Sequence, residues 1–385
     1  CSLPALPAHA ADAPEAAKPR ARDLGIPFDG TPGRHDAITD VAGIEVGHAT
    51  IIRGEGALKV GLGPVRTGVT AILPRGHEGR APVFAATYDL NGNGEMTGTH
   101  WIEDSGFLEG PVMITNTSSV GVVRDAVIGW RMRHGGPDAE GYAWSLPVVA
   151  ETWDGYLNDT NGFHVKPADA YAALDAARGG AVAEGNVGGG TGMICNGYKG
   201  GIGTASRVLP ERLGGYTVGV LVQCNYGLRS QLRIAGVTVG RELGGKGPWD
   251  EDLGSIIVVV ATDAPLIPTQ LKRMAKRVPL GLGRMGSYSG DGSGDIFIAF
   301  STANLAAGAA QLPSTDERAG VPALMQVLPN RDQEALFLAT VQATEEAIVN
   351  ALIAAETMTG VDGHTVEAIP HEALRQVLKR YNRLN

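Results

Sequence analysis

The stretch GRELGGKGPWDEDLGSIIVVV, residues 240–260, contains the sharpest change of character in the chain. Its first half is rich in glycine and charged residues, which predicts a flexible loop. Its second half begins at Ser255 and is a continuous apolar run rich in β-branched residues, which predicts a buried strand. Gly254-Ser255 therefore lies where a loop enters a buried strand, a place where a chain can be cut without losing its fold.

Similar patterns continue on both sides of this stretch. Short β-branched runs predict strands at 44–48, 69–73, 112–115, 216–223, 255–262 and 296–301. Ala and Leu recur at helical spacing and predict helices at 118–132, 167–178, 268–277, 333–356 and 371–382. The apolar continuity of the strands predicts sheets covered on both faces. Because no internal repeat or linker interrupts the chain, we expect residues 23–385 to form a single α/β domain.

The composition is that of a soluble globular protein. Of the 385 residues, 43% are hydrophobic and 19% are charged. A net charge of −9 leaves no basic footprint, so we expect no nucleic-acid partner. No run reaches about 18 consecutive apolar residues, so we expect no membrane span.

The first ten residues, CSLPALPAHA, are small and apolar and end in Ala8-His9-Ala10. This pattern is typical of the end of a secretory signal peptide with an A-x-A cleavage site. Two alternatives are a lipoprotein that carries its lipid on Cys1 and a disordered tail on a cytoplasmic protein. We expect a periplasmic protein in which residues 1–22 are a signal-peptide remnant or a disordered lead-in.

Cysteine and histidine patterns give no indication of a metal site. Cys195 and Cys224 lie in apolar stretches outside any CxxC pair, and we expect two buried free thiols, with a disulfide as the alternative. The nine histidines form no H-E-x-x-H pattern. The glycine-rich stretch NVGGGTGM at 186–193 lacks the GK[ST] ending of a phosphate loop, and we expect it to line the active-site cleft as backbone. We therefore expect no metal and no cofactor.

Serine needs a base before it can act as a nucleophile. A serine at the start of a chain can use its own α-amine for this purpose. The chain must then break before the serine, and a small preceding residue lets the hydroxyl approach the preceding carbonyl. Gly254-Ser255 meets this requirement, although a Gly-Ser pair by itself is more often a simple turn into a strand.

The surroundings of Gly254-Ser255 make the prediction specific. The run IIVVVATDAPLIPTQLKRMAKR follows directly, and DGSGDIFIAFSTAN follows at 291–304. These segments resemble the peptidase family that includes the L-aminopeptidase D-amidase/esterase and the bacterial β-peptidyl aminopeptidases. The resemblance extends to RDLGIPF at 22–28, ITDVAGIEVGHAT at 38–50, RTGVTAILP at 66–74, TNTSSVG at 115–121, ETWDGYLND at 151–159, NVGGGTGM at 186–193 and VQCNYG at 222–227.

This resemblance implies a precursor that cleaves itself into two chains that stay together, here 23–254 and 255–385. It implies a four-layer α/β/β/α sandwich, similar to N-terminal-nucleophile hydrolases but with different connectivity. It also implies a homotetramer or larger oligomer. The activity it implies is removal of N-terminal residues, including β-amino acids, from peptides, amides or esters that carry a free amine.

The resemblance also assigns roles to individual residues. Ser255 matches the nucleophile, and Ser293 and Asp295 match the second serine and the carboxylate that assist it. Members can carry Glu at the last position, so Asp295 has a shorter reach. Asn225 matches a donor to the oxyanion, and Glu151 matches the acid that meets the substrate's α-amine. Taken alone, Ser293, Asp295 and Asn225 would be typical of turns. Glu151 taken alone would be typical of a solvated surface.

Trp153 stands where at least some members carry tyrosine. Tryptophan lacks the phenolic hydroxyl, so we expect Trp153 to shape the specificity pocket rather than to donate a hydrogen bond from that position. Tyr156 is close in sequence but does not match the family position, and we give it no catalytic role.

Two other functions are compatible with these residues. An acyl transferase resembling ornithine acetyltransferase also cleaves itself, but its usual nucleophile is threonine, and it would move an acetyl group from acetylornithine to glutamate. An exported binding protein could keep the fold without the chemistry, and it would remain one uncut chain.

Overall fold

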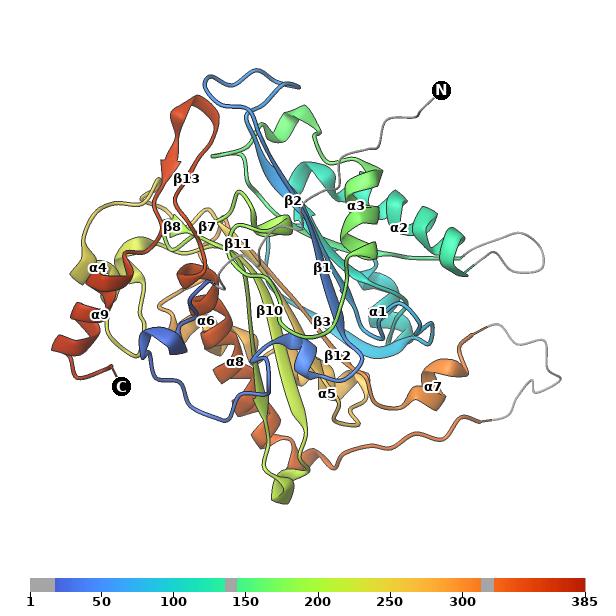
Figure 1. The fold of residues 1–385 in the computed structure, drawn as a ribbon. Helices are drawn as coiled ribbons and strands as arrows, with labels where there is room; N and C mark the ends of the chain where they lie inside the picture. Colours follow the sequence, from blue (N-terminus) through green and yellow to red (C-terminus); the bar gives the residue numbers. More distant parts are fainter. Residues whose placement is uncertain (1–17, 136–143, 313–321, 385) are drawn as a thin grey trace, which may run out of the picture.

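The computed structural model describes residues 18–135, 144–312 and 322–384. The signal-peptide and lipid-anchor predictions on residues 1–17 lie outside these ranges. The described strands form two main sheets (Figure 1). The four-stranded sheet has the order β1-β2-β5-β6, with bounds Glu45–Arg53, Val65–Leu73, Val112–Asn116 and Val148–Thr152. The six-stranded sheet has the order β4-β3-β12-β11-β10-β9, with bounds Phe107–Leu108, Val83–Gly92, Gly294–Ser301, Ser255–Thr262, Thr217–Asn225 and Gly201–Val208.

The two sheets pack face to face through an apolar core. Ile72 and Ile114 of the four-stranded sheet belong to the same buried cluster as Leu221, Ile257 and Ile298 of the six-stranded sheet. Every residue of the interior strands β2, β10, β11 and β12 is buried, because each of these strands is covered on both faces. The predicted coverage of the sheets is confirmed.

Helices cover the two outer faces. On the four-stranded sheet lie α2 (Val120–Gly135) and α3 (Pro167–Asp175), and on the six-stranded sheet lie α5 (Pro268–Ala275), α6 (Val278–Arg284) and α8 (Glu334–Ile353). Figure 1 shows the resulting order of helix, sheet, sheet and helix. The predicted four-layer α/β/β/α sandwich is confirmed.

Helix α8 is the central helix of the outer layer. Within the described residues, 330–353 is the one helical segment long and apolar enough to cross a membrane. However, 83% of the apolar 18-residue stretch within this segment is buried inside the fold. Because α8 packs on β9 and β10, its apolar character is accounted for by its place in the protein core.

The predicted elements recur within a few residues of their expected bounds, but β3, β6 and β9 were not predicted. Strand β9 reads GIGTASRV and lacks the apolar run of its neighbours. Its glycines allow close packing, since a Cβ on Gly203 would lie 2.0 Å from the Ala347 carbonyl oxygen of α8. The remaining elements are α1 (Thr99–Ser105), β7 (Ile194–Cys195), β8 (Tyr198–Lys199), α4 (Val239–Leu243), α7 (Leu305–Ala309), β13 (Met358–Thr359), β14 (Thr365–Val366) and α9 (His371–Arg380).

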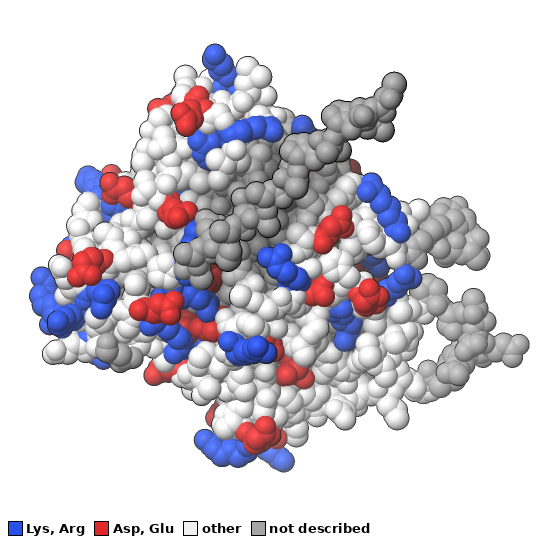
Figure 2. Space-filling model, viewed as in Figure 1, with Lys and Arg blue, Asp and Glu red and all other residues white. Residues whose placement is uncertain are grey.

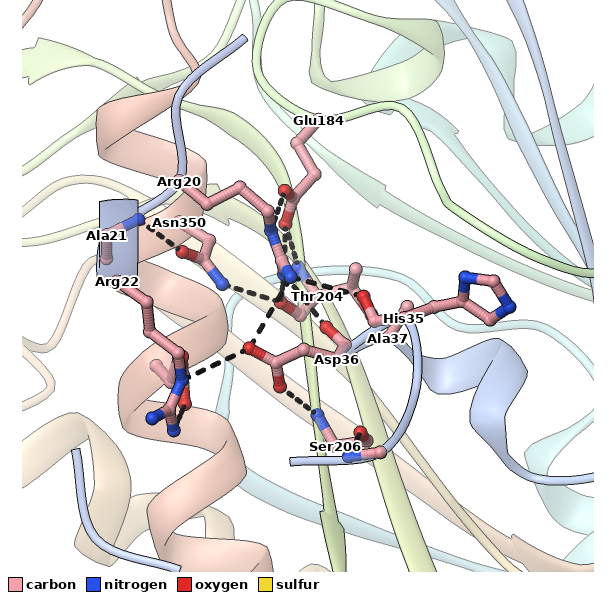
Figure 3. Close-up of polar contacts among 12 residues, drawn as sticks. Arg20, Ala21, Arg22, His35, Asp36, Ala37, Glu184, Thr204, Ser206 and Asn350 are labelled. Atoms are coloured by element: carbon pink, nitrogen blue, oxygen red, sulfur yellow. Dashed lines mark hydrogen bonds and ion pairs between the residues drawn. The ribbon is translucent and has the colours of Figure 1, made fainter. Parts of the chain in front are cut away.

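Residues 20–22 already bond to the rest of the fold, so the predicted lead-in over 1–22 is wrong for these residues. Arg20 Nε donates to Glu184 at 2.7 Å, and the Ala21 amide donates to Asn350 Oδ1 at 3.0 Å (Figure 3). Arg22 Nε donates to Glu346 at 2.6 Å. Buried carboxylates need such cationic partners, and a sequence pattern that looks like a Pro- and Ala-rich tail does not reveal them.

The prediction of two free thiols is also wrong, because Cys195 and Cys224 form a disulfide. Their Cα atoms lie 5.4 Å apart, within the usual range for a disulfide. The hairpin of β7 and β8 lies against the end of β10 and brings together cysteines 29 residues apart in sequence.

Charged side chains of both signs are interspersed on the face of the molecule in Figure 2. On that face, Lys and Arg do not gather into a single stripe of the kind that nucleic-acid-binding surfaces show.

Candidate active site

Ser255 is the first residue of β11 and lies between two neighbouring strands at the end of the six-stranded sheet. It faces Asn225 of β10 in antiparallel pairing and Gly294 of β12 in parallel pairing. The Ser255 hydroxyl oxygen accepts a hydrogen bond from the Gly294 amide at 3.0 Å, and the residue is 8% exposed. The predicted junction of a loop and a buried strand is confirmed.

Gly254 fits tightly against the end of β10. A Cβ at this position would lie 2.1 Å from the Asn225 carbonyl oxygen and 2.7 Å from Tyr226 Cα. Glycine is therefore required here by packing, in addition to leaving the Gly254 carbonyl open to attack. The same closeness brings Asn225 beside the 254–255 peptide bond.

Asn225 is the last residue of β10, and its amide group is fixed at both ends. Its Oδ1 accepts from the Ile194 amide at 2.7 Å, and its Nδ2 donates to the Trp153 carbonyl oxygen at 2.9 Å. Directly opposed residues on antiparallel strands project to the same face of a sheet, so the Asn225 amide and the Ser255 hydroxyl share a face. This placement suits the predicted oxyanion donor.

Ser293 and Asp295 are fully buried and contact each other. The Ser293 hydroxyl donates to Asp295 Oδ1 at 2.7 Å. Burial raises the pKa of Asp295, and this hydrogen bond opposes the rise. The expected contact between Ser293 and Asp295 is therefore present. In the described residues, the Ser255 hydroxyl is bonded to the Gly294 amide instead of to Ser293.

Glu151 lies near the end of β6, in the sheet opposite Ser255. Its Oε1 accepts from the Glu95 amide at 2.9 Å, and its Oε2 accepts from the Thr117 hydroxyl. Burial raises the pKa of Glu151, and these hydrogen bonds oppose the rise. A Cβ on Gly94 would lie 3.4 Å from both Glu151 Oε1 and Gly294 Cα, so the carboxylate reaches the neighbourhood of Ser255. Glu151 is buried, so it is not the solvated surface carboxylate that a glutamate taken alone would suggest.

Aromatic side chains stand beside these groups. Trp153 is 44% exposed, and its ring centroid lies 6.3 Å from that of Trp249, which in turn lies 5.3 Å from that of Tyr156. The backbone carbonyl of Trp153 accepts the hydrogen bond from Asn225, so this row of rings starts at a residue that contacts the partner of Ser255 in the sheet. Sequence reasoning missed Trp249, although it lies in the loop that precedes Gly254.

Sequence reasoning also missed the hairpin of β7 and β8. Asn196 and Gly197 connect its strands, with φ of 48° and 69°. An Asn-Gly pair with positive φ at both residues is the preferred two-residue turn of a β-hairpin, and this pair was the sequence signal that could have revealed the hairpin. The hairpin supplies the Ile194 amide that binds Asn225.

The glycines of the 186–193 stretch are buried against both sheets. A Cβ on Gly188 would lie 2.4 Å from Thr70 Oγ1, and one on Gly190 would lie 2.4 Å from the Ile202 amide. The stretch thus lies next to the hairpin that holds Asn225. Among the described residues, no group of three or more His, Cys, Asp or Glu side chains is placed to hold a metal ion.

Known proteins resemble this chain over nearly its whole length. The β-peptidyl aminopeptidase BapA of Sphingosinicella microcystinivorans is 55% identical, with 97% of this chain and 95% of that protein covered. The solved structure of the L-aminopeptidase D-Ala-esterase/amidase of Ochrobactrum anthropi, a serine aminopeptidase with a variant of the Ntn hydrolase fold, matches with a TM-score of 0.86. It is 49% identical and covers 96% of this chain and 100% of its own. A β-aminopeptidase of a Burkholderia species matches with a TM-score of 0.84 at 47% identity, covering 94% of this chain and 98% of its own.

Residues 36–366 match the sequence model of peptidase family S58. This range includes Glu151, Asn225 and the Gly254-Ser255 junction, which the fold brings together at one end of the two sheets. The chain belongs to peptidase family S58, and it is a hydrolase that acts on peptide bonds.

Proposed function

We propose that this protein is a self-processing aminopeptidase with an N-terminal serine nucleophile. The observation that carries the proposal is the placement of Ser255 at the start of β11, beside the Asn225 amide and in reach of the buried Glu151. Relatives that are named aminopeptidases and serine aminopeptidases support it.

Maturation begins with attack of the Ser255 hydroxyl on the Gly254 carbonyl carbon. The C–N bond then breaks, the acyl group moves to the Ser255 oxygen as an ester, and the Ser255 nitrogen becomes a free amine. Water hydrolyses the ester, which leaves a carboxylate on Gly254 and restores the hydroxyl. The products are an α-chain ending at Gly254 and a β-chain beginning at Ser255.

In the mature enzyme, the Ser255 α-amine takes the proton of the hydroxyl as it attacks the substrate. Asn225 Nδ2 donates to the oxygen on which negative charge develops, a contact worth about 3 to 4 kcal/mol where such donors have been removed. The proton passes to the leaving amine, an acyl-enzyme forms, and water or another amine resolves it. Ser293 and Asp295 assist the nucleophile.

Substrate selection follows from Glu151. A buried carboxylate stabilises a cation far more than a solvated one does, so a substrate with a free α- or β-ammonium group gains binding that a blocked substrate lacks. We infer that the substrates are peptides, amides or esters with a free N-terminal amine, including β-amino acids. Trp153 and its aromatic neighbours shape the pocket for the N-terminal residue.

A comparison of amide substrates tests this proposal. The p-nitroanilides of β-alanine and L-alanine should be hydrolysed, whereas their N-acetylated forms should be turned over roughly 10-fold to 100-fold more slowly, as expected from loss of an interaction with a charged group. Equal turnover of blocked and free substrates would rule out the aminopeptidase. Acetyl transfer from acetylornithine to glutamate in place of hydrolysis would identify an acyl transferase, and no turnover of any substrate would favour the binding protein.

We also propose that the protein is exported to the periplasm. The disulfide between Cys195 and Cys224 supports this, because disulfides persist in oxidising compartments. Osmotic-shock fractionation of the native host should release the protein with periplasmic markers, or leave it membrane-bound if Cys1 carries lipid. Recovery with cytoplasmic markers would contradict the proposal.

A homotetramer or larger oligomer is the assembly we propose. Leu280 on α6 and Leu338 on α8 are 59% and 51% exposed and lie on the same apolar groove of the outer helical layer. Burial of such a face in an interface would remove apolar surface from water. Light scattering after gel filtration should give at least four times the protomer mass, and a monomer at micromolar concentration would contradict it.

A further inference from the structure

Lys199, in β8, is a lysine whose ammonium group lies wholly inside the protein. The residue has no exposed surface. Its Nζ donates to the carbonyl oxygens of Met193 and Gly200, both at 2.8 Å, and to that of Gly190 at 3.4 Å. Three acceptors match the three N–H donors of a protonated amine, so the group is fully satisfied without a carboxylate.

Burying this amine has a cost that an apolar side chain would avoid. Burial lowers the pKa of Lys199 well below its ordinary value, as expected for a cation taken out of water, whereas the three carbonyl acceptors around Nζ bind the protonated amine and oppose this shift. The neighbouring cluster of Ile194, Leu157, Met358 and Val366 is apolar, and an apolar side chain at position 199 would suit it. Packing alone therefore does not explain why an amine occupies this position.

The β-hairpin aligns Lys199 with the residue that holds Asn225. Ile194 and Lys199 are direct partners in the two-stranded pairing of β7 and β8. The tight turn at Asn196 and Gly197 sets this register. As a result, the Lys199 ammonium reaches the peptide group that joins Met193 to Ile194.

That peptide group connects Lys199 to Asn225. Its carbonyl oxygen, on Met193, accepts from Lys199 Nζ at 2.8 Å, and its N–H, on Ile194, donates to Asn225 Oδ1 at 2.7 Å. An N–H group can bind the amide oxygen of Asn225 but not its nitrogen, so this bond fixes which end of the side chain is the donor. Hydrogen bonds in such a chain polarise one another.

We propose that Lys199 is a positioning residue for the reaction at Ser255, acting through the Met193–Ile194 peptide to orient and polarise the Asn225 amide. A cation on the carbonyl oxygen draws electron density from the peptide and makes its N–H a stronger donor. The stronger bond to Oδ1 in turn makes Asn225 Nδ2 a better donor to the developing oxyanion. This inference rests on the proposed function, because it assigns Lys199 a part in the same reaction.

The first test replaces Lys199 with methionine, which keeps the length and removes the donors. Removal of a direct oxyanion donor lowers kcat by roughly 100-fold to 1000-fold, and an indirect effect should be smaller. We expect Lys199→Met to lower kcat by roughly 10-fold to 100-fold, with KM for β-alanine p-nitroanilide nearly unchanged because Glu151 is intact. Val366→Ala, which truncates the same apolar cluster without touching the hydrogen-bond chain, is the control for lost stability.

A double-mutant cycle with Asn225→Ala tests the route of the effect. If Lys199 acts through Asn225, Lys199→Met should change kcat less than about 2-fold in the Asn225→Ala background. The proposal is overturned if the two losses multiply, if KM changes rather than kcat, or if Lys199→Met loses no more kcat than Val366→Ala at equal melting temperature.

Lys199→Gln provides a second variant in case the methionine variant does not fold. Glutamine keeps a neutral N–H donor for the Met193 carbonyl but no charge. We expect a kcat between those of the wild type and the Asn225→Ala variant, and a wild-type kcat would overturn the proposal. Turnover by the wild type and its loss in Ser255→Ala are measured in parallel, so failure of the proposed function would show as an inactive wild type rather than as an unaffected Lys199 variant.

Discussion

Gly254 and Ser255 owe their special character to the strands around them. The chain contains two other Gly-Ser pairs, at Gly286 and Gly292. Gly292-Ser293 also leads into an interior strand, β12, but the Ser293 hydroxyl is buried against Asp295. At Gly254 the serine is itself the first residue of the strand, and its hydroxyl meets the Gly294 amide. A sequence pattern can identify the loop and the strand, but the contact with β10 that excludes a side chain at 254 arises from tertiary packing.

Gly254→Ala tests that packing. The added Cβ would lie 2.1 Å from the Asn225 carbonyl oxygen, so the loop must shift and the 254 carbonyl must move away from the Ser255 hydroxyl. We expect self-cleavage to slow at least roughly 100-fold, as misplacement by about 1 Å typically does, and intact-mass time courses measure it. Gly283→Ala on α6, where an added Cβ meets nothing within 4 Å, is the control and should cleave like the wild type.

The charge state of Glu151 sets the acid side of the activity profile. Because burial raises its pKa, the carboxylate gains its proton at a higher pH than a solvated glutamate does, and KM should rise as pH falls through that raised value. Glu151→Gln should raise KM by roughly 10-fold to 100-fold near neutral pH, as loss of a charge-assisted hydrogen bond predicts, and remove this pH dependence. Steady-state kinetics between pH 4 and pH 8 measure both, with the exposed Glu103→Gln as the control. An unchanged acid limb in Glu151→Gln would contradict the role.

At the scale of elements, the strands with continuous apolar runs were predictable and the polar ones were not. β11 was predicted at its observed bounds, because its continuous β-branched run indicates a strand covered on both faces. All eight of its residues are buried. β9 and the β7–β8 hairpin carry glycines and polar side chains. These residues are explained by packing against α8 and β10, which the sequence pattern does not show. The positions of Lys199 and of the disulfide depend on that hairpin, so neither followed from the sequence.

The disulfide fastens this hairpin to β10, next to Asn225. Closing a loop between residues 29 apart stabilises a protein by about 3 to 4 kcal/mol in the chain-entropy estimate. Replacing both Cys195 and Cys224 with alanine should lower the free energy of unfolding by roughly this amount, measured by urea denaturation. Alkylation of the unreduced, denatured wild type should modify neither cysteine. Modification of both would contradict the disulfide.

At the scale of the whole molecule, residues 20–22 close the fold over α8 and β9. Arg20 brings positive charge to the carboxylates of Asp36 and Glu184 (Figure 3). Arg22 does the same for Glu346. The layers themselves were predictable through the family resemblance, but this cluster was not. Charged residues distant in sequence carry no periodicity that would indicate a shared buried site.

Asp36 makes stability depend on pH. Burial and the nearby Glu346 carboxylate raise the pKa of Asp36 to about 6. A raised pKa means that the folded state favours the protonated form of Asp36. The stability that protonated Asp36 contributes is therefore fully present below the ordinary pKa of an aspartate, and it is lost as pH rises through about 6.

Asp36→Asn mimics the protonated form at every pH. The free energy of unfolding at pH 8 should rise by roughly 1 to 3 kcal/mol relative to the wild type, given about 1.4 kcal/mol per pKa unit, with little difference at pH 4. Urea denaturation at the two pH values measures this, with the half-exposed Asp332→Asn as the control. Equal destabilisation at both pH values would show that the ion pairs of Asp36 outweigh its repulsion by Glu346.

Self-cleavage by Ser255 is the central claim, and the intact mass of the denatured protein tests it most directly. The wild type should give two chains that meet between Gly254 and Ser255, and Ser255→Ala should give one uncut chain. A wild type that remains a single chain after folding under conditions that support activity would contradict the account, as would cleavage at this bond in Ser255→Ala.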